Sequence, residues 1–139
     1  MLPTPEILLI DDDPAWLETL AEFLRHKGFA IQALTDPVQG LAWVMDNGVA
    51  LAVIDFNMPG MNGLELLRRL RHRRPDLPVL LMSSEDEPAL AKRALAEGAR
   101  AFVAKTAAPR LLPRMLRQAL HTRSMPSRCQ IHPAKGAPC

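Results

Sequence analysis

The sequence predicts an open, doubly wound α/β domain made of five strand–helix units. Short apolar runs alternate along the chain with longer segments whose apolar residues recur at helical spacing. The run at residues 49–54 is apolar on both faces, which is typical of a central parallel strand covered by helices on both sides. Parallel strands joined by right-handed helical crossovers form such a sheet.

The expected elements follow in order along the chain. Strands are predicted at residues 7–10, 29–34, 49–54, 78–82 and 101–104. Helices are predicted to start at residues 14 and 37, to include residues 64–70, and to span about 88–97 and 109–121. The second helix is expected to bury an apolar face that comprises Val38, Leu41, Ala42 and Met45.

Two Asp-Pro pairs mark the starts of the first two helices. Asp13 precedes Pro14, and Asp36 precedes Pro37, so each aspartate can cap a helix whose first residue is a proline. Asp13 is therefore interpreted as a helix cap and not as a metal ligand.

Composition and charge narrow the class of protein. No apolar run of the 139 residues reaches the roughly eighteen residues of a membrane span, and the N-terminus lacks the features of a secretory signal. A cytoplasmic protein with no membrane partner is therefore expected. Residues 1–97 carry 9 Lys/Arg and 15 Asp/Glu, a net charge of −6, whereas residues 98–139 carry 8 Lys/Arg and no acid, a net charge of +8. This basic end could attract nucleic acid or acidic lipid, or it could be a solvated helix face and tail.

The last residues differ in composition from the rest of the chain. Residues 122–139 are rich in Pro, Ser and basic groups, and they are expected to be a disordered tail or a truncated linker. Cys129 and Cys139 both lie there, so a disulfide framework of the fold is not expected. With His132 they would make a weak metal-ligand set.

Four of the five predicted strands end in a chemically capable residue. The first ends in Asp11 and Asp12, the third in Asp55, the fourth in Ser83 and the fifth in Lys105. Each alone could be an ordinary loop or surface residue. Because ligands of a doubly wound sheet bind beyond the carboxyl ends of its strands, their shared placement predicts a functional site.

Three carboxylates at one edge of a sheet require a compensating charge. Two like charges about 4 Å apart repel by roughly 4 kcal/mol at an effective dielectric of 20, so the cluster needs a cation or a proton. Oxygen ligands without His or Cys favour Mg²⁺, which also binds phosphate oxygens. With Lys105 at the same edge, the residues predict a site for phosphoryl chemistry.

These motifs resemble the receiver domains of bacterial two-component response regulators, over about residues 5–121. The similar segments are residues 7–14, 53–63, 82–84 and 104–105. The most specific is Asp55 with the Met-Pro-Gly-Met-Asn-Gly loop that follows it closely. The resemblance implies a flavodoxin-like (βα)5 fold with strand order 2-1-3-4-5.

The resemblance also implies a role for each residue of the site. Asp55 would accept a phosphoryl group from a sensor histidine kinase or phosphotransfer protein. Mg²⁺ would be held by Asp12 directly, by Asp11 largely through water, by Asp55, and by the backbone carbonyl of Asn57. Lys105 would pair with a phosphoryl oxygen. Because Asp55 is itself the group that is modified, the domain is not expected to be an enzyme in the usual sense.

A conformational switch is implied by the same resemblance. Ser83 would move to bond the phosphoryl group and Phe102 would turn inward, because the added oxygens need donors. The surface of the fourth helix, fifth strand and fifth helix would change, and would bind a partner or form a phosphorylation-linked homodimer. Asn57 and Glu85 occupy positions that tune dephosphorylation, and they predict a short-lived phosphorylated state.

Two positions depart from the family pattern. Lys105 is followed by Thr106 where the family usually has a proline with a cis peptide bond. A trans bond is expected here, because a cis bond at a non-proline residue costs about 3 kcal/mol. Pro113 lies four residues after Pro109, where its ring would clash with a helix carbonyl. The last helix is therefore predicted to be kinked or to start late.

Two other classes of function stay open at this point. The chain could be a DNA-binding transcription regulator without its effector, although sequence-specific DNA binding is not expected from the short tail, and loose binding to the basic end would depend on salt. It could also be a Mg²⁺-dependent phosphatase or phosphotransferase with an aspartyl nucleophile. Such enzymes carry a second acid two residues later, and here that residue is Asn57.

Overall fold

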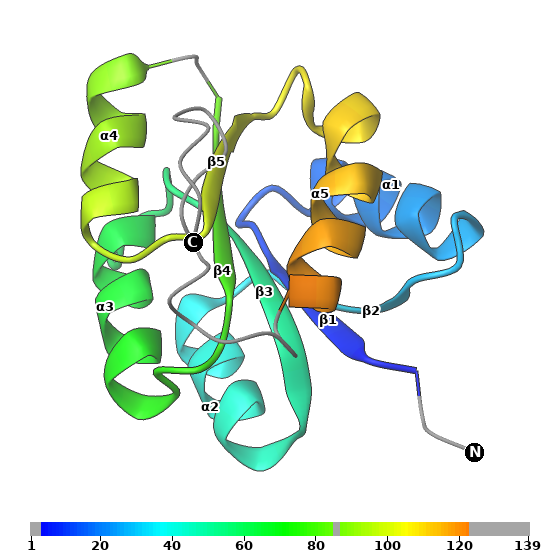
Figure 1. Ribbon diagram of the computed structural model, residues 1–139, viewed down its shortest axis with the longest axis horizontal. Helices are drawn as coiled ribbons and strands as arrows, with labels where there is room; N and C mark the ends of the chain where they lie inside the picture. Colours follow the sequence, from blue (N-terminus) through cyan, green and yellow to red (C-terminus); the bar gives the residue numbers. More distant parts are fainter. Residues whose placement is uncertain (1–3, 85–86, 123–139) are drawn as a thin grey trace.

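The computed structural model describes residues 4–84 and 87–122, which form one five-stranded parallel sheet with helices on both faces (Figure 1). The elements are β1 (Glu6–Ile10), α1 (Pro14–His26), β2 (Ala30–Leu34), α2 (Pro37–Asp46), β3 (Val49–Asp55), α3 (Gly63–Arg73), β4 (Val79–Ser83), α4 (Pro88–Ala96), β5 (Ala101–Ala104) and α5 (Ala108–Thr122). The strand order is β2-β1-β3-β4-β5. The predicted fold class and strand order are confirmed.

Two hydrophobic cores lie on opposite faces of the sheet. Helices α1 and α5 cover one face, and α2, α3 and α4 cover the other (Figure 1). Every residue of β3 is buried. Ala52 and Ile54 pack toward α2, α3 and α4, whereas Leu51 and Val53 pack toward α1 and α5. The two-sided apolar pattern of this strand therefore corresponds to its central place in the sheet.

Both predicted aspartate caps are present. Asp13 Oδ1 accepts hydrogen bonds from the backbone N–H groups of Ala15 and Trp16, at 3.1 and 3.3 Å. Asp36 Oδ1 accepts one from the N–H of Val38 at 3.1 Å. These bonds satisfy N–H groups that have no partner within their helix.

Helix α2 buries a different face from the predicted one. Val38 and Met45, two residues of the predicted face, are 60% and 46% exposed. Gly40 and Val44 are buried instead, and a Cβ at Gly40 would overlap Ile10 Cδ1 of β1. Because α2 has apolar residues around most of its circumference, their spacing does not fix its rotation. The close approach of Gly40 to Ile10 fixes the rotation of the helix.

The predicted late start of the last helix is wrong. Helix α5 spans Ala108–Thr122, begins before Pro109 and contains Pro113. Leu112 and Leu116 are fully buried against the sheet. Their burial offsets the cost of a proline inside a helix, about 3 kcal/mol. The predicted kink stays a prediction.

The predicted tail and the predicted absence of a membrane span are the remaining expectations about the chain. Apart from Thr122, the predicted tail at residues 122–139 lies outside the described residues, together with both cysteines and His132. The predicted division between a domain at residues 5–121 and a tail stays a prediction. Within residues 4–84 and 87–122, none of the helices has the length and apolar character needed to cross a membrane.

Candidate functional site

The carboxyl ends of four strands bring the predicted site residues to one edge of the sheet. Asp11 follows β1, Asp55 ends β3, Ser83 ends β4 and Lys105 follows β5. Among the described residues, the polar side chains that are buried are those of Asp11, Asp55 and Ser83. Since burying a charge is costly unless it is paired, these residues point to a site and not to ordinary packing.

Three carboxylates and one ammonium group form the centre of this site. One oxygen from each of Asp11, Asp12 and Asp55 lies within 4.8 Å of the others. Lys105 Nζ is 2.7 Å from Asp11 Oδ2 and 3.5 Å from Asp55 Oδ1. Asp12 is exposed, whereas Asp11 and Asp55 are buried. The lysine compensates one of the three negative charges.

Backbone N–H groups orient the two buried carboxylates. Asp13 N–H donates to Asp11 Oδ1 at 3.0 Å, and Asn57 N–H donates to Asp55 Oδ1 at 3.3 Å. Asp11 Oδ2 is buried and accepts no hydrogen bond from a backbone N–H of the described residues. The Lys105 ammonium is close to this oxygen and pairs with it as an ion.

The donor set fits a small divalent cation. Among the described residues it contains only carboxylate oxygens and no nitrogen or sulfur ligand, and hard oxygen donors are those that Mg²⁺ prefers. Asp11 Oδ2, a buried oxygen 2.7 Å from the Lys105 ammonium, is suited to pair with such a cation. The predicted carboxylate ligands are therefore brought together as expected.

Burial and mutual repulsion change the proton affinities at the site. Burial, followed by the negative charge of Asp11, raises the pKa of Asp55 to about 6, although Lys105 and the Asn57 N–H oppose this rise. Burial lowers the pKa of Lys105, but Asp11 and then Asp55 outweigh it, and the pKa is raised overall. At neutral pH the lysine is charged, and the Asp55 carboxylate is ionised at a free-energy cost.

The loop after β3 turns back tightly over the strand end. Gly63 N–H donates to the carbonyl of Phe56 at 2.9 Å. A Cβ at Gly63 would lie 2.7 Å from both the Asp55 carbonyl oxygen and Phe56 Cα. Sequence reasoning assigned Gly63 no role. The sequence feature that could have indicated this close approach is a glycine at the first position of α3, directly after the helix cap Asn62. Asn62 Oδ1 accepts the Glu65 N–H at 3.0 Å.

The substitution Gly63→Ala is expected to lower the free energy of unfolding by about 2 kcal/mol, because overpacking typically costs about 1–3 kcal/mol. The added methyl group would press on backbone atoms of Asp55 and Phe56, which cannot rotate away. Urea unfolding measures the change. Gly48→Ala is the matched control, since nothing lies within 4 Å of a Cβ there. Equal midpoints for the two variants would contradict this steric account.

A backbone hydrogen bond links the end of β4 to the residue that follows β5. Lys105 N–H donates to the Ser83 carbonyl at 2.7 Å. The peptide bond between Lys105 and Thr106 is trans, so this expectation is confirmed. Phe102 on β5 is partly buried and packs against the core that α2, α3 and α4 cover. The backbones of Ser83 and Lys105 are thus held next to each other.

The predicted dephosphorylation-tuning pair is described only in part. Asn57 is exposed, and Ser84 Oγ lies 3.5 Å from its Oδ1 atom. Glu85 lies outside the described residues. The short-lived phosphorylated state that the two residues predict stays a prediction.

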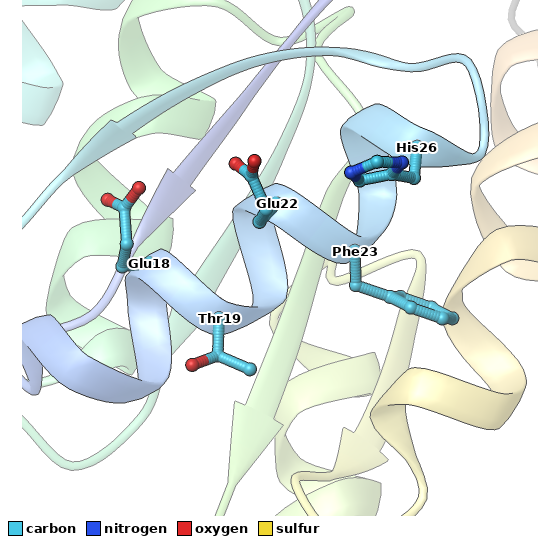
Figure 2. Close-up of a pocket in the computed structure, with 5 residues that line it drawn as sticks. All are labelled: Glu18, Thr19, Glu22, Phe23 and His26. Atoms are coloured by element: carbon cyan, nitrogen blue, oxygen red, sulfur yellow. The ribbon is translucent and has the colours of Figure 1, made fainter.

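A surface hollow on α1 is separate from the carboxylate cluster. It is lined by Glu18, Thr19, Glu22, Phe23 and His26, and Figure 2 shows the Phe23 ring directed toward α5. None of the predicted site residues lines it. Its two glutamates are exposed, as is usual for the solvated face of a helix.

A family model and curated relatives both match this chain over most of its length. Residues 7–117 match the family model described as the response regulator receiver domain. The chain is 35% identical over 139 residues to the transcriptional activator protein ExaE of Pseudomonas putida, with 94% of this chain and 65% of that protein covered. It is 34% identical over 129 residues to the response regulator MprA of Mycobacterium sp. (strain KMS), with 92% and 55% covered. The chain therefore spans less than two thirds of the length of either relative.

The solved structures include a close match in fold. The response regulator receiver domain protein (CheY-like) from Methanospirillum hungatei JF-1 superposes with a TM-score of 0.81 and 26% sequence identity. The match covers 88% of this chain and 98% of that one. Nearly the whole described part of this chain thus corresponds to one such domain.

Proposed function

This chain belongs to the response regulator receiver family, and on that premise we propose that it is switched by Mg²⁺-dependent phosphorylation of Asp55. The phosphoryl donor would be a sensor histidine kinase or a phosphotransfer protein. The observation that carries the proposal is the placement of Asp55, buried beside Asp11 and Asp12 and 3.5 Å from the Lys105 ammonium. Receiver domains are signalling domains, so Asp55 is an acceptor of the group and not a catalyst acting on a metabolite.

The reaction is a displacement at phosphorus. An Asp55 carboxylate oxygen attacks the phosphorus of a phosphohistidine, the P–N bond breaks, and the histidine nitrogen keeps the electron pair. The product is an acyl phosphate on Asp55. Burial and the Asn57 N–H hold the attacking carboxylate in place, and positioning with charge neutralisation provides most of the catalysis in such transfers.

The other residues supply charge and ligands. Mg²⁺ would be held by Asp12 directly, by Asp11 largely through water, by Asp55 and by the Asn57 carbonyl. When bound, it would neutralise charge on the carboxylates and on the phosphoryl oxygens. Lys105 would pair with one phosphoryl oxygen. Its raised pKa, which Asp11 and Asp55 bring about against burial, keeps the ammonium charged for that contact.

Phosphorylation would be read out through β4 and β5. Ser83 would hydrogen-bond a phosphoryl oxygen and Phe102 would turn inward, so that the α4-β5-α5 surface changes and binds a partner or a second copy. The backbone bond from Lys105 to Ser83 supports a joint movement of the two residues. Phe102 has no hydroxyl group, so it can be buried without a hydrogen-bond partner.

The proposal is tested by the mass of the intact protein after incubation with phosphoramidate or acetyl phosphate. Wild type with Mg²⁺ should gain about 80 Da, the mass of one phosphoryl group. Asp55→Asn, and wild type with EDTA, should gain nothing. A gain that persists in Asp55→Asn would rule out Asp55 as the acceptor.

The phosphorylated state is expected to decay within minutes once the donor is removed, because Asn57 and Glu85 resemble residues of short-lived receivers. The decay of the added mass measures this lifetime. A half-life of many hours in Mg²⁺ would contradict the assignment of these two positions.

The effect of Mg²⁺ on stability should depend on pH. The pKa of Asp55 in the folded protein is about 6, above its ordinary value of 3.8. Between these values the metal-free folded state binds more protons than the unfolded chain, so its free energy of unfolding falls as pH rises. Mg²⁺ must displace that proton. The Mg²⁺-induced rise in Tm should therefore be full at pH 8 and small at pH 5, as followed by thermal unfolding at fixed Mg²⁺. An equal Mg²⁺-induced rise in Tm at pH 5 and pH 8 would contradict the raised pKa of Asp55 as the cause of this dependence.

Binding of this chain to a specific DNA sequence is not proposed. The relative from Pseudomonas putida is named a transcriptional activator, but this chain covers only part of that protein. The basic residues of positions 98–139 could still bind nucleic acid loosely. A gel shift at increasing salt and with competitor DNA separates loose binding from sequence-specific binding. Loose binding should be lost at high salt and to the competitor, whereas sequence-specific binding would persist against competitor DNA.

A further inference from the structure

The side chain of Trp16, in the first turns of α1, lies beside the site. Lys105 Nζ is 5.8 Å from the centroid of the Trp16 ring, within the range of a cation–π interaction, for which tryptophan is the best aromatic partner. We propose that Trp16 is a positioning residue for Lys105, which keeps the ammonium at the site when Mg²⁺ occupies its carboxylate partners. This inference rests on the proposed phosphorylation of Asp55.

The ion pairs of Lys105 are the ones that a bound metal would disturb. Its ammonium is paired with Asp11 and Asp55, and both carboxylates are proposed ligands of Mg²⁺. A divalent cation competes with the lysine for the same oxygens. The indole ring is uncharged and is not a ligand of Mg²⁺, so the contact with Trp16 can persist when both ion pairs weaken.

The main chain at Lys105 is held by two hydrogen bonds, because its N–H donates to the Ser83 carbonyl at 2.7 Å and its carbonyl accepts the Ala108 N–H at 3.2 Å. Lys105 follows a strand of four residues, and Thr106 stands where the family usually has a proline. The long, flexible stem of a lysine has several rotatable bonds. The backbone hydrogen bonds do not act on this stem, whereas an aromatic surface against its head group restrains it directly.

Trp16 is itself held firmly by the same turn that orients Asp11. Asp13 Oδ1 accepts the backbone N–H of Trp16 at 3.3 Å, and Asp13 N–H donates to Asp11 Oδ1 at 3.0 Å. The ring packs at the border of the core between α1, α5 and the sheet. The aromatic surface and the carboxylate that pair with Lys105 are thus set by one short segment.

The indole is not explained by stability alone. Trp16 Nε1 is buried and has no hydrogen-bond partner among the described residues, and an unsatisfied buried donor is unfavourable. In contrast, Trp43 Nε1 donates to Glu6 Oε1 at 2.8 Å. A phenylalanine at position 16 would avoid this donor, whereas the indole ring gives the stronger cation–π interaction with Lys105.

The first test compares phosphorylation rates from phosphoramidate at saturating Mg²⁺. Trp16→Leu should react roughly threefold or more slowly than wild type, and Trp16→Phe should be intermediate, because a benzene ring keeps a weaker cation–π interaction. The Mg²⁺ affinity of Trp16→Leu should be unchanged or higher, since the lysine competes less well. Trp43→Phe is the matched control and should react like wild type.

Three results would overturn the proposal. These are a wild-type rate in Trp16→Leu, a Trp16→Phe variant as slow as Trp16→Leu, and a loss of rate in Trp16→Leu that is matched by a loss of Mg²⁺ affinity. The last would indicate general damage to the site. If wild type itself takes up no phosphoryl group, the proposed function fails and the contact is judged by the second test.

The second test observes the contact directly by NMR of lysine labelled with ¹³C. The Cε protons of Lys105, identified by their absence in Lys105→Arg, should be shifted upfield relative to those of Lys92 by the ring current of Trp16. The shift should disappear in Trp16→Leu and persist in wild type after Mg²⁺ is added. No upfield shift, or one that Mg²⁺ abolishes, would contradict the positioning role.

Discussion

The substitution Lys105→Met is expected to lower the free energy of unfolding by about 3 kcal/mol at pH 8 without Mg²⁺, the low end of the cost of breaking a buried ion pair. Lys105 is the cation paired with the buried carboxylates of Asp11 and Asp55. Its removal leaves two negative charges buried without a positive partner. Urea unfolding measures the change, and Mg²⁺ should restore part of the loss.

The loss should shrink as pH falls. The positive charge of Lys105 opposes the rise in the pKa of Asp55 that burial and Asp11 produce, so the pKa of Asp55 is higher in Lys105→Met. Protonation then removes the unpaired charge, and the stability difference present at pH 8 should become smaller toward pH 5. Lys92→Met, on the exposed surface of α4, should cost little at either pH. A loss at Lys105 that is equal at both pH values would contradict the electrostatic explanation.

The substitution Asp12→Asn is expected to weaken Mg²⁺ binding about tenfold or more, which corresponds to about 1.4 kcal/mol, without lowering the stability of the metal-free protein. Asp12 is exposed and contributes negative charge to the cluster. Removing that charge takes away a metal ligand and also relieves repulsion with Asp55. The substitution should therefore weaken Mg²⁺ binding while it leaves the metal-free protein as stable or more stable. A purely structural residue would lower the stability with and without Mg²⁺.

Thermal unfolding over a range of Mg²⁺ concentrations measures both effects of Asp12→Asn, because a ligand that binds only the folded state raises Tm by an amount that grows with the ratio of its concentration to its Kd. Asp46→Asn, an exposed aspartate at the end of α2, is the control and should leave the Mg²⁺ response unchanged. A wild-type Mg²⁺ response in Asp12→Asn would exclude Asp12 as a ligand.

Much of the site could be predicted because it depends on strand ends. The apolar run before Asp55 fixes a buried strand, and parallel topology brings Asp11, Asp55, Ser83 and Lys105 to one edge. The trans bond after Lys105 was also predictable, because its cause is local. The roles of these residues in phosphorylation stay predictions.

Other features depend on packing between distant segments and could not be predicted from spacing. The rotation of α2 is set by the contact between Gly40 and Ile10. The tight turn at Gly63 involves the Asp55 backbone, which the sequence pattern does not place in contact with it. The approach of Trp16 to Lys105 joins α1 to the loop after β5, and no periodicity in either segment indicates it.

The most direct test of the central claim is to identify the phosphorylated residue in wild type. The protein is incubated with phosphoramidate and Mg²⁺, reduced with borohydride, digested and mapped by mass spectrometry. Reduction converts an aspartyl phosphate to homoserine, and we expect homoserine at position 55 and unchanged aspartates at Asp11 and Asp12, with no conversion in EDTA. Conversion at another aspartate, or none at position 55 when the intact protein has gained a phosphoryl group, would contradict the assignment of Asp55 as the acceptor.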